Sequence, residues 1–273
     1  MKQSVDHSAR FIIDKMACVD SYISIQGNIG AGKSTLFKHI KQYLSDNCML
    51  YSDDKHNGNH WFITVDEPLA DWTRKVYTTK KVGESGLPED AVSIFDIFYR
   101  DMERYGFLFQ VNAFITRISR IMCEISDIQE QHPGIYIYLI SERSLTTDHL
   151  FFANLYNTGI ISQVEYRIYE AFYNLICGDI VKRENVMVYI PTPPEVCHMR
   201  ILKRDRPGED SISLNYLTCL HQAHQRMIRD FRKANPRNFI ISMELEGDCD
   251  DMYRVAEEVI NGIICNAMRQ ISA

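Results

Sequence analysis

Hydrophobic and polar positions alternate with two different periods along the chain, and together they predict strands separated by helices. Five short apolar runs have the length and the β-branched or aromatic content of buried strands. They are SYISI (21–25), WFITV (61–65), IYIYLI (135–140), VMVYI (186–190) and NFIISM (238–243). Stretches with helical period predict helices at 33–45, 69–80, 90–130, 147–156, 162–177, 194–204, 213–234 and 250–269.

This order of elements predicts the fold class. Strands that alternate with helices are typical of a parallel sheet covered by helices on both faces. The sequence contains no internal repeat, no low-complexity tract and no linker rich in proline or glycine. We therefore expect an α/β fold with a five-stranded parallel sheet, in which residues 20–273 form one domain and residues 1–19 a loosely ordered tail.

Composition narrows the possible partners and the compartment. The 273 residues are 45% hydrophobic and carry a net charge of −6, with no long basic stripe of the kind that binds nucleic acid. No apolar run approaches the length of a membrane span. The eight cysteines form no CxxC pair and no zinc spacing, which indicates free thiols in a reducing compartment. We expect a cytoplasmic protein with no nucleic-acid or membrane partner, because the first twenty residues also lack the features of a signal or transit peptide.

The stretch ISIQGNIGAGKSTL at 23–36 places three glycines directly between a strand and a helix. It matches the GxxxxGK[ST] pattern, in which successive backbone N–H groups surround phosphate groups. The N-terminus of the following helix would also face the anion. Lys33 would reach the β- and γ-phosphates and the Ser34 hydroxyl would ligate Mg²⁺. The loop therefore predicts binding of ATP or GTP.

Charged residues follow three of the predicted strands, at the sheet edge where α/β proteins bind their ligands. Glu67 follows the second strand in DEPLADW, and Glu142 and Arg143 follow the third in SERSLTTD. The segment after the fourth strand carries Arg200, Lys203, Arg204, Arg206 and Glu209. Phosphoryl transfer needs a metal-binding carboxylate, a group that orients the acceptor hydroxyl, and cations that neutralise the transferred group. The sequence supplies all three at one edge.

Five segments, in this order, resemble motifs of the deoxyribonucleoside kinases. GNIGAGKST is similar to the phosphate loop of that family, EPLADW to its EPxxxW segment, and YRDMERYGFLFQ to its substrate helix with an FQ pair. SERS is similar to the E/DRS motif, and RILKRDRPGE to the arginine-rich lid, where RPGE also resembles herpesviral thymidine kinases. The resemblance covers about residues 20–255. It implies a P-loop kinase fold, a homodimer, and transfer of phosphate from ATP, with Mg²⁺, to the 5′-hydroxyl of a deoxyribonucleoside.

The resemblance also implies residue roles on the ATP side. Glu67 would accept the proton of the 5′-hydroxyl, and Arg143 would orient both that base and the phosphoryl group. Glu142 and Ser34 would hold Mg²⁺. The implied ATP-binding set is Gly27, Asn28, Ile29, Gly30, Ala31, Gly32, Lys33, Ser34, Thr35, Arg200, Arg204, Arg206, Asp248 and Cys249.

On the nucleoside side, the resemblance implies that Tyr99 and Glu209 hydrogen-bond the sugar 3′-hydroxyl. Gln110 would pair with the edge of the base, because an amide both donates and accepts hydrogen bonds. The side chains that would enclose the base are Ile29, Trp72, Phe109 and Phe152.

The preferred base depends on Arg117 and Asp148. They stand where relatives similar to deoxycytidine and deoxyguanosine kinases carry a polar pair at the base, and such a pair suits an exocyclic amine. We therefore expect a preference for deoxycytidine and purine deoxynucleosides over thymidine. A thymidine or broad-specificity kinase and a nucleoside monophosphate kinase remain alternatives. A GTPase is disfavoured because the sequence has no NKxD motif.

Overall fold

The structure is a computed structural model that describes residues 15–47, 49, 60–75, 91–132, 135–206, 208–245 and 251–271. Asp248 and Cys249, which the resemblance assigns to the ATP side, lie outside the described residues. The same holds for residues 1–14 of the predicted tail and for residues 76–80 of a predicted helix.

A five-stranded parallel sheet forms the centre of the molecule. Its strands are β1 (Val19–Gly27), β2 (His60–Val65), β3 (Tyr136–Glu142), β4 (Glu184–Ile190) and β5 (Phe239–Ser242), in the order β2-β3-β1-β4-β5. All four pairings are parallel, so the predicted strands and the α/β class are confirmed. Ile25 of β1 lies opposite Glu142 and Gly27 lies opposite Ile190, which brings the carboxyl ends of β1, β3 and β4 to one edge.

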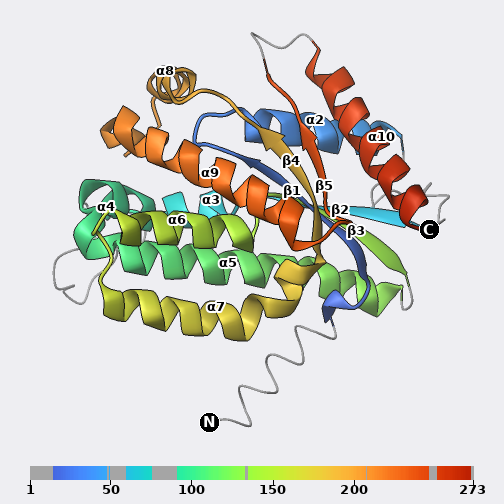
Figure 1. Ribbon diagram of the computed structural model, residues 1–273, viewed down its shortest axis with the longest axis horizontal. Coiled ribbons are helices and arrows are strands. Elements are labelled where there is room, and N and C mark those ends of the chain that lie inside the picture. The colour runs from blue at the N-terminus through green and yellow to red at the C-terminus, as the bar shows by residue number, and fades with distance from the viewer. Residues whose placement is uncertain are drawn as a thin grey trace.

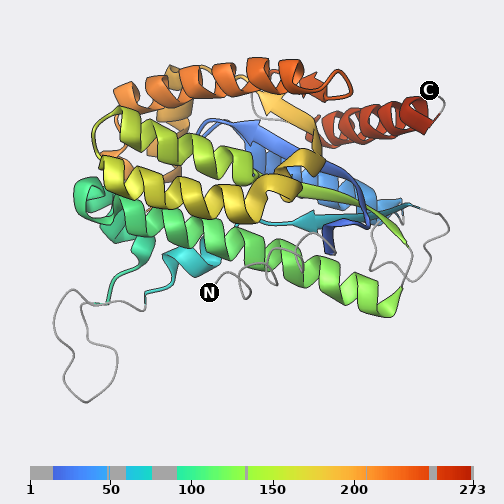
Figure 2. The same ribbon diagram turned by 60° about the horizontal axis from the view of Figure 1, so that its bottom comes forward.

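Helices cover both faces of the sheet. Figures 1 and 2 show α5, α6, α7 and α9 packed over one face, with α2 and α10 on the other. The helices are α2 (Lys33–Asp46), α3 (Leu69–Thr73), α4 (Ile94–Arg100), α5 (Met102–Gln131), α6 (Leu145–Asn157), α7 (Gln163–Arg183), α8 (Pro194–Arg204), α9 (Leu214–Ala234) and α10 (Met252–Ile271), with a 3₁₀ turn at η1 (Glu209–Ser211). None of the helices in the described ranges is long and apolar enough to cross a membrane.

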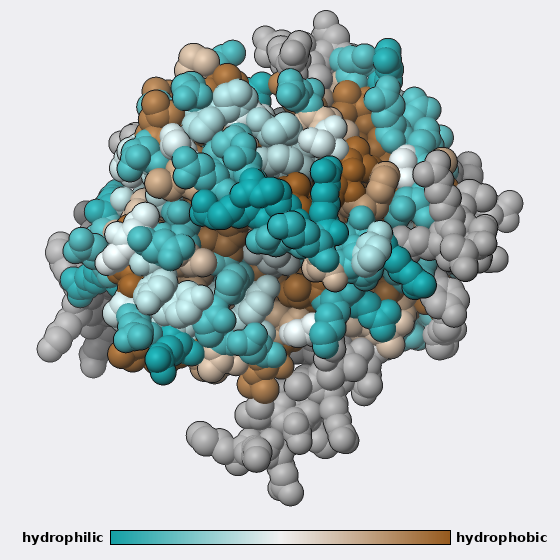
Figure 3. All heavy atoms as spheres, viewed as in Figure 1, coloured by the Kyte–Doolittle hydropathy of each residue, from teal (hydrophilic) through white to brown (hydrophobic). Residues whose placement is uncertain are grey.

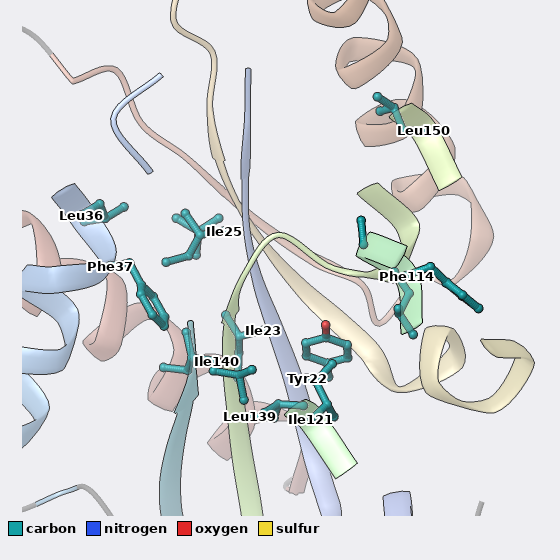
Figure 4. Packing of buried hydrophobic residues seen from close by; sticks show 14 of the residues in the cluster. Tyr22, Ile23, Ile25, Leu36, Phe37, Phe114, Ile121, Leu139, Ile140 and Leu150 are labelled. Atoms are coloured by element: carbon teal, nitrogen blue, oxygen red, sulfur yellow. The ribbon is translucent and has the colours of Figure 1, made fainter. Parts of the chain in front are cut away.

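The core lies on both sides of β1 and β3. Alternate residues of β1 point to opposite faces, as strand geometry requires. Ile23 and Ile25 face Leu36 and Phe37 of α2, whereas Tyr22 faces α5 (Figure 4). Burial on both faces explains why the strands read as almost continuous apolar runs. The outer surface, by contrast, is mostly hydrophilic with scattered hydrophobic patches on the side seen in Figure 3.

Three helix predictions were wrong in extent, and one of them, the helix expected at 162–177, continues to Arg183 as α7. The single helix expected at 90–130 is divided into α4 and α5 at Asp101, whose backbone leaves the helical region at φ −150°. The Asp101 side chain accepts a hydrogen bond from the Arg104 amide at 3.1 Å and so starts a new helix. The helix expected at 69–80 ends at Thr73, because Arg74 is extended. The apolar period continues through Asp101, so periodicity alone did not reveal the break.

Candidate active site

The phosphate loop connects β1 to α2 in a conformation that only glycine adopts easily. Gly32 has φ 99° and directly precedes α2, while Gly30 has φ 77°. A Cβ atom on Gly30 would lie 2.6 Å from the carbonyl oxygen of Cys197 in α8, so the loop also needs glycine for space. Lys33 follows, and its Nζ donates a hydrogen bond to the Asn28 carbonyl at 2.7 Å. The loop therefore has the cradle shape that the sequence predicts.

Lys33 is buried next to a second cation, Arg143. Burial and the nearby cation of Arg143 lower the pKa of Lys33 to about 7, although Glu142 and Glu67 oppose the shift. A cavity of about 390 Å³ adjoins it. The cavity is lined by Gly30, Gly32, Lys33, Ser34, Thr35, Arg200, Arg204, Arg206, Leu245 and Met252. Four cationic side chains around a glycine loop and a helix N-terminus suit a polyphosphate.

Ser34 and Glu142 meet where α2 begins and β3 ends. The Ser34 hydroxyl donates a hydrogen bond to Glu142 Oε1 at 2.7 Å. Burial and the neighbouring Glu67 raise the pKa of Glu142 above its ordinary value. A hydroxyl and a carboxylate beside a phosphate site are oxygen ligands of the kind that Mg²⁺ takes together with substrate phosphates and water. These two residues therefore fit the metal that the sequence predicts.

Glu67, which follows the end of β2, contacts two guanidinium groups. Arg143 Nε lies 3.2 Å from Glu67 Oε1, and Arg117 Nη2 lies 3.4 Å from the same oxygen. Burial by itself raises the pKa of Glu67, but Arg143, Arg117 and Lys33 outweigh it and hold the pKa below its ordinary value. Glu67 is therefore ionised and oriented before any substrate arrives.

Arg117 also connects Glu67 to a second carboxylate. Its Nε lies 2.7 Å from Asp148 Oδ2, and its Nη1 donates to the Glu142 carbonyl at 2.8 Å. Arg117 is fully buried, and the pKa of Asp148 is raised by burial against the opposing effect of Arg117. The Arg117 guanidinium thus links Asp148, which is predicted to contact the nucleobase, to Glu67, which is predicted to accept the proton.

A second cavity, of about 240 Å³, lies next to these carboxylates. Lys33, Ser34, Glu67, Glu142 and Arg143 line one part of it. The other part is lined mainly by apolar and aromatic side chains, namely Ile29, Leu69, Trp72, Phe95, Phe98, Tyr99, Phe109, Gln110, Ala113 and Phe151. Flat apolar walls with one buried amide are typical of a site for a planar, hydrogen-bonding ligand. A larger cavity of about 690 Å³ between α6 and α9 contains none of the predicted site residues.

Three residues of the predicted lid, Arg204, Arg206 and Glu209, line the edge of this cavity. Arg204 Nη2 lies 2.6 Å from Glu209 Oε2, and Arg206 Nη1 lies 3.1 Å from Glu209 Oε1. Ser211 donates to the Tyr99 carbonyl at 3.3 Å and so attaches the lid to α4. Tyr99 and Glu209 line the same cavity, as expected for two residues that would contact one sugar hydroxyl.

Comparison with known proteins identifies the family. A family model described as deoxynucleoside kinase matches residues 23–268. The chain belongs to the deoxynucleoside kinase family. Membership makes it a phosphotransferase that acts on nucleosides, and it confirms the family predicted from the motifs.

Curated relatives of this kinase include deoxycytidine kinases. A probable deoxycytidine kinase of fowlpox virus (strain NVSL) is 28% identical over 230 residues, which cover 84% of this chain and 79% of the relative. Human deoxycytidine kinase is 27% identical over 251 residues, which cover 87% and 88%. A solved structure of deoxyadenosine kinase from M. mycoides with bound dCTP has a TM-score of 0.60 at 20% identity, covering 88% of this chain and 99% of that one. This last likeness shows the shared fold.

The structure of this deoxynucleoside kinase separates two neighbouring phenylalanines. Phe152 does not line the cavity; it is fully buried and stacks on Tyr169 with 3.7 Å between ring centroids. Phe151 lines the cavity instead. Sequence analysis also missed Phe95 and Phe98, although both lie within four residues of Tyr99 in the helical pattern. Phe95 lies one helical turn before Tyr99, which was a usable signal, whereas Phe98 directly precedes Tyr99.

Proposed function

We propose that this enzyme transfers the γ-phosphoryl group of ATP to the 5′-hydroxyl of deoxyribonucleosides and prefers deoxycytidine and purine deoxynucleosides. One observation carries the proposal: a single cavity is lined by Lys33, Glu67 and Arg143 on one side and by Gln110 with aromatic rings on the other. A nucleoside whose base lay among the rings would direct its 5′-hydroxyl at Glu67 and the phosphate loop. Ile29, Trp72 and Phe109 line this cavity and stay predictions as residues that enclose the base. Phe152 does not line it and is not part of this proposal.

The mechanism we propose depends on alignment and on charge. Glu67, already ionised, would accept a hydrogen bond and then the proton of the 5′-hydroxyl, while Arg143 holds the carboxylate in place. Lys33 and the lid arginines would neutralise the phosphates. Mg²⁺, held by Ser34 and Glu142, would supply further charge neutralisation at the phosphate oxygens.

Lid movement is part of the proposal. Arg204 and Arg206 both pair with Glu209, so they are not free to bind phosphate in this arrangement. ATP would compete for these guanidiniums, since a polyphosphate carries more charge than one carboxylate. Glu209 would then be released to hydrogen-bond the sugar 3′-hydroxyl with Tyr99. Closure of the lid would also exclude water that hydrolyses ATP.

The base preference rests on the buried Arg117–Asp148 pair. Asp148 reaches the cavity and Arg117 lies directly behind it. A carboxylate at the cavity wall accepts a hydrogen bond from an exocyclic amine, as on cytosine or adenine, and offers nothing to a thymine methyl group. This supports deoxycytidine and purine deoxynucleosides over thymidine.

The proposal is tested by following ADP release with Mg²⁺ across the four deoxynucleosides, their ribose forms and their monophosphates. We expect the highest kcat/KM with deoxycytidine or a purine deoxynucleoside. Turnover that required a monophosphate would instead identify a nucleoside monophosphate kinase. Equal activity on all four deoxynucleosides would identify a broad-specificity enzyme.

We further propose that residues 20–273 act as one kinase domain, after a tail at 1–19, and that the domain forms a homodimer. Large hydrophobic side chains are exposed along α7 and on α5, including Phe172, which is 49% exposed. The others are Leu108, Ile115, Val164, Ile168 and Leu175. An interface of two long helices from each copy would cover them. The free cysteines support a reducing, cytoplasmic location, and neither nucleic acid nor a membrane is proposed as a partner.

A further inference from the structure

Arg143 has an unusual backbone that fixes where its side chain starts. Its φ of 64° lies in the left-handed region, which residues other than glycine rarely adopt. Two hydrogen bonds hold it there: its amide donates to the Ile25 carbonyl at 3.0 Å, and the Ser141 hydroxyl donates to its carbonyl at 2.5 Å. The guanidinium therefore leaves the turn after β3 in a defined direction, toward Glu67.

The polar contacts of that guanidinium leave its plane weakly defined. Arg143 Nε lies 3.2 Å from Glu67 Oε1, and Nη1 donates to the Gly27 carbonyl at 3.4 Å. Both contacts are made at the edge of the group, and both are long for charge-assisted hydrogen bonds. Cζ of the guanidinium lies over the Phe151 ring, 4.6 Å from its centroid. Contact with a flat aromatic face fixes the plane that the edge contacts leave loose.

Phe151 in turn contacts His224 of α9. Its ring meets the His224 ring edge to face, at 6.2 Å between centroids and 87° between planes. His224 is buried, and its Nδ1 faces the Leu220 carbonyl at 2.8 Å, so Nδ1 carries the proton. Burial and Arg143 lower the pKa of His224 to about 3. The histidine is therefore a neutral support that adds no charge beside Arg143 and Lys33.

The helix that carries His224 also supports the phosphate loop. Asn28 Nδ2 donates to the Leu217 carbonyl of α9 at 2.8 Å. One helix, α9, thus contacts both the loop that would hold ATP and the Phe151 ring beneath Arg143. A shift of Phe151 would tilt the guanidinium relative to both Glu67 and the loop.

We propose that Phe151 is a positioning residue for phosphoryl transfer: its ring carries the face of the Arg143 guanidinium, and His224 fixes the ring. This inference rests on the proposed function, because it assumes that Arg143 orients Glu67 and the transferred group. Phe151 also lines the cavity proposed for the nucleoside, but the effect proposed here passes through Arg143. Loss of Phe151 should therefore reduce kcat much more than it changes KM.

The test compares Phe151→Leu and Phe151→Tyr with a matched control. Leu removes the aromatic face, and we expect kcat to fall by about tenfold, with KM for ATP and for deoxynucleoside changed by less than about threefold. Tyr keeps the face, and its kcat should stay within about threefold of wild type. Phe114→Leu makes the same change at a buried ring of α5 outside the cavity, and it should retain kcat within about twofold. If Phe151→Leu lowers the melting temperature, Phe151→Met fills similar volume and replaces it.

A double-mutant cycle with Arg143→Lys separates positioning from general packing. Lysine has no planar face, so the loss caused by Arg143→Lys should be at least about fivefold smaller in the Phe151→Leu background than in wild type. Losses that simply multiply, or a kcat unchanged by Phe151→Leu, would overturn this inference. Full activity of Arg143→Lys would instead contradict the role of Arg143 in the proposed function. The two failures are therefore distinguishable.

Discussion

Arg143 Nε lies 3.2 Å from Glu67 Oε1, which joins the residue after β3 to the residue after β2. The two side chains come from segments 76 positions apart in the sequence (143 minus 67). Arg143 lowers the pKa of Glu67, and so does Lys33 at the end of the phosphate loop. An ionised carboxylate therefore lies close to that loop. This relationship is the centre of the chemistry we propose.

Replacement of Glu67 by Gln should reduce turnover far more than substrate binding. The amide keeps the shape of the side chain but cannot accept the proton, so we expect kcat to fall by at least about 100-fold. The KM for deoxynucleoside should change by less than about fivefold, as ADP release assays would show. Glu130→Gln, the same change at an exposed position of α5, is the control. Turnover close to wild type would mean that another group is the base.

ATP binding should be accompanied by uptake of a proton by Lys33. The pKa of Lys33 is about 7 without nucleotide, and the polyphosphate would raise it because it favours the charged form. At pH 8 the free enzyme has lost most of this proton, so binding should take up close to one. Titration calorimetry at pH 8 in buffers of different ionisation enthalpy measures the number. Lys33→Arg should abolish the uptake, and equal heats in every buffer would refute the expectation.

The double variant Arg117→Met with Asp148→Ala should shift preference toward thymidine. Removal of both partners avoids leaving one buried charge unpaired, whereas Arg117→Met alone should destabilise the fold by about 3–5 kcal/mol. Loss of the polar pair makes room for the thymine methyl group. The ratio of kcat/KM for thymidine to that for deoxycytidine should rise by at least about tenfold. Because Arg117 also contacts Glu67, kcat should fall on every substrate. An unchanged ratio would discredit the base preference.

His224 should make the fold less stable in mild acid. Its pKa is about 3 in the folded protein and near 6.5 when unfolded, so the unfolded state binds more protons below pH 6.5. Stability is therefore lost as pH falls from 6.5 toward 3. Between pH 7 and pH 5 this group should remove about 2 kcal/mol from the free energy of unfolding. Urea unfolding at both pH values should show a smaller decline for His224→Asn than for wild type or His221→Asn. An identical decline in all three would contradict the assignment.

Removal of the Glu142 carboxylate should weaken the binding of Mg²⁺. Glu142→Gln leaves Ser34 as the single proposed protein ligand, so half-maximal activity should need at least about tenfold more Mg²⁺. A magnesium titration at fixed ATP measures this. Asp71→Asn, at an exposed ion pair with Arg120, should leave the titration unchanged. An unchanged titration for Glu142→Gln would place the metal elsewhere.

Sequence analysis identified most of the site because its residues follow strands. Glu67, Glu142 and Arg143 each lie at the carboxyl end of a strand or within two residues of it, and Lys33 follows the loop after β1. A parallel sheet necessarily brings those ends to one edge, so their convergence was predictable before their contacts were known. The glycine loop was equally readable, because close backbone approach excludes a Cβ atom.

Other features depended on contacts that no local pattern encodes. Phe151 and Phe152 are adjacent and chemically identical, yet one lines the cavity under Arg143 and the other stacks on Tyr169. The rotation of α6 against α5, α7 and α9 decides which of them faces the site. In the same way, the triple contact of Arg117 requires three separate segments to meet around one guanidinium.

The sequence by itself determined the strands, the phosphate loop and the charged residues at the sheet edge, because backbone periodicity and glycine geometry act locally. Only the tertiary structure decided which aromatic ring supports Arg143 and how Arg117 joins Glu67, Glu142 and Asp148. These depend on packing between distant segments, where small rotations of a helix exchange one side chain for its neighbour.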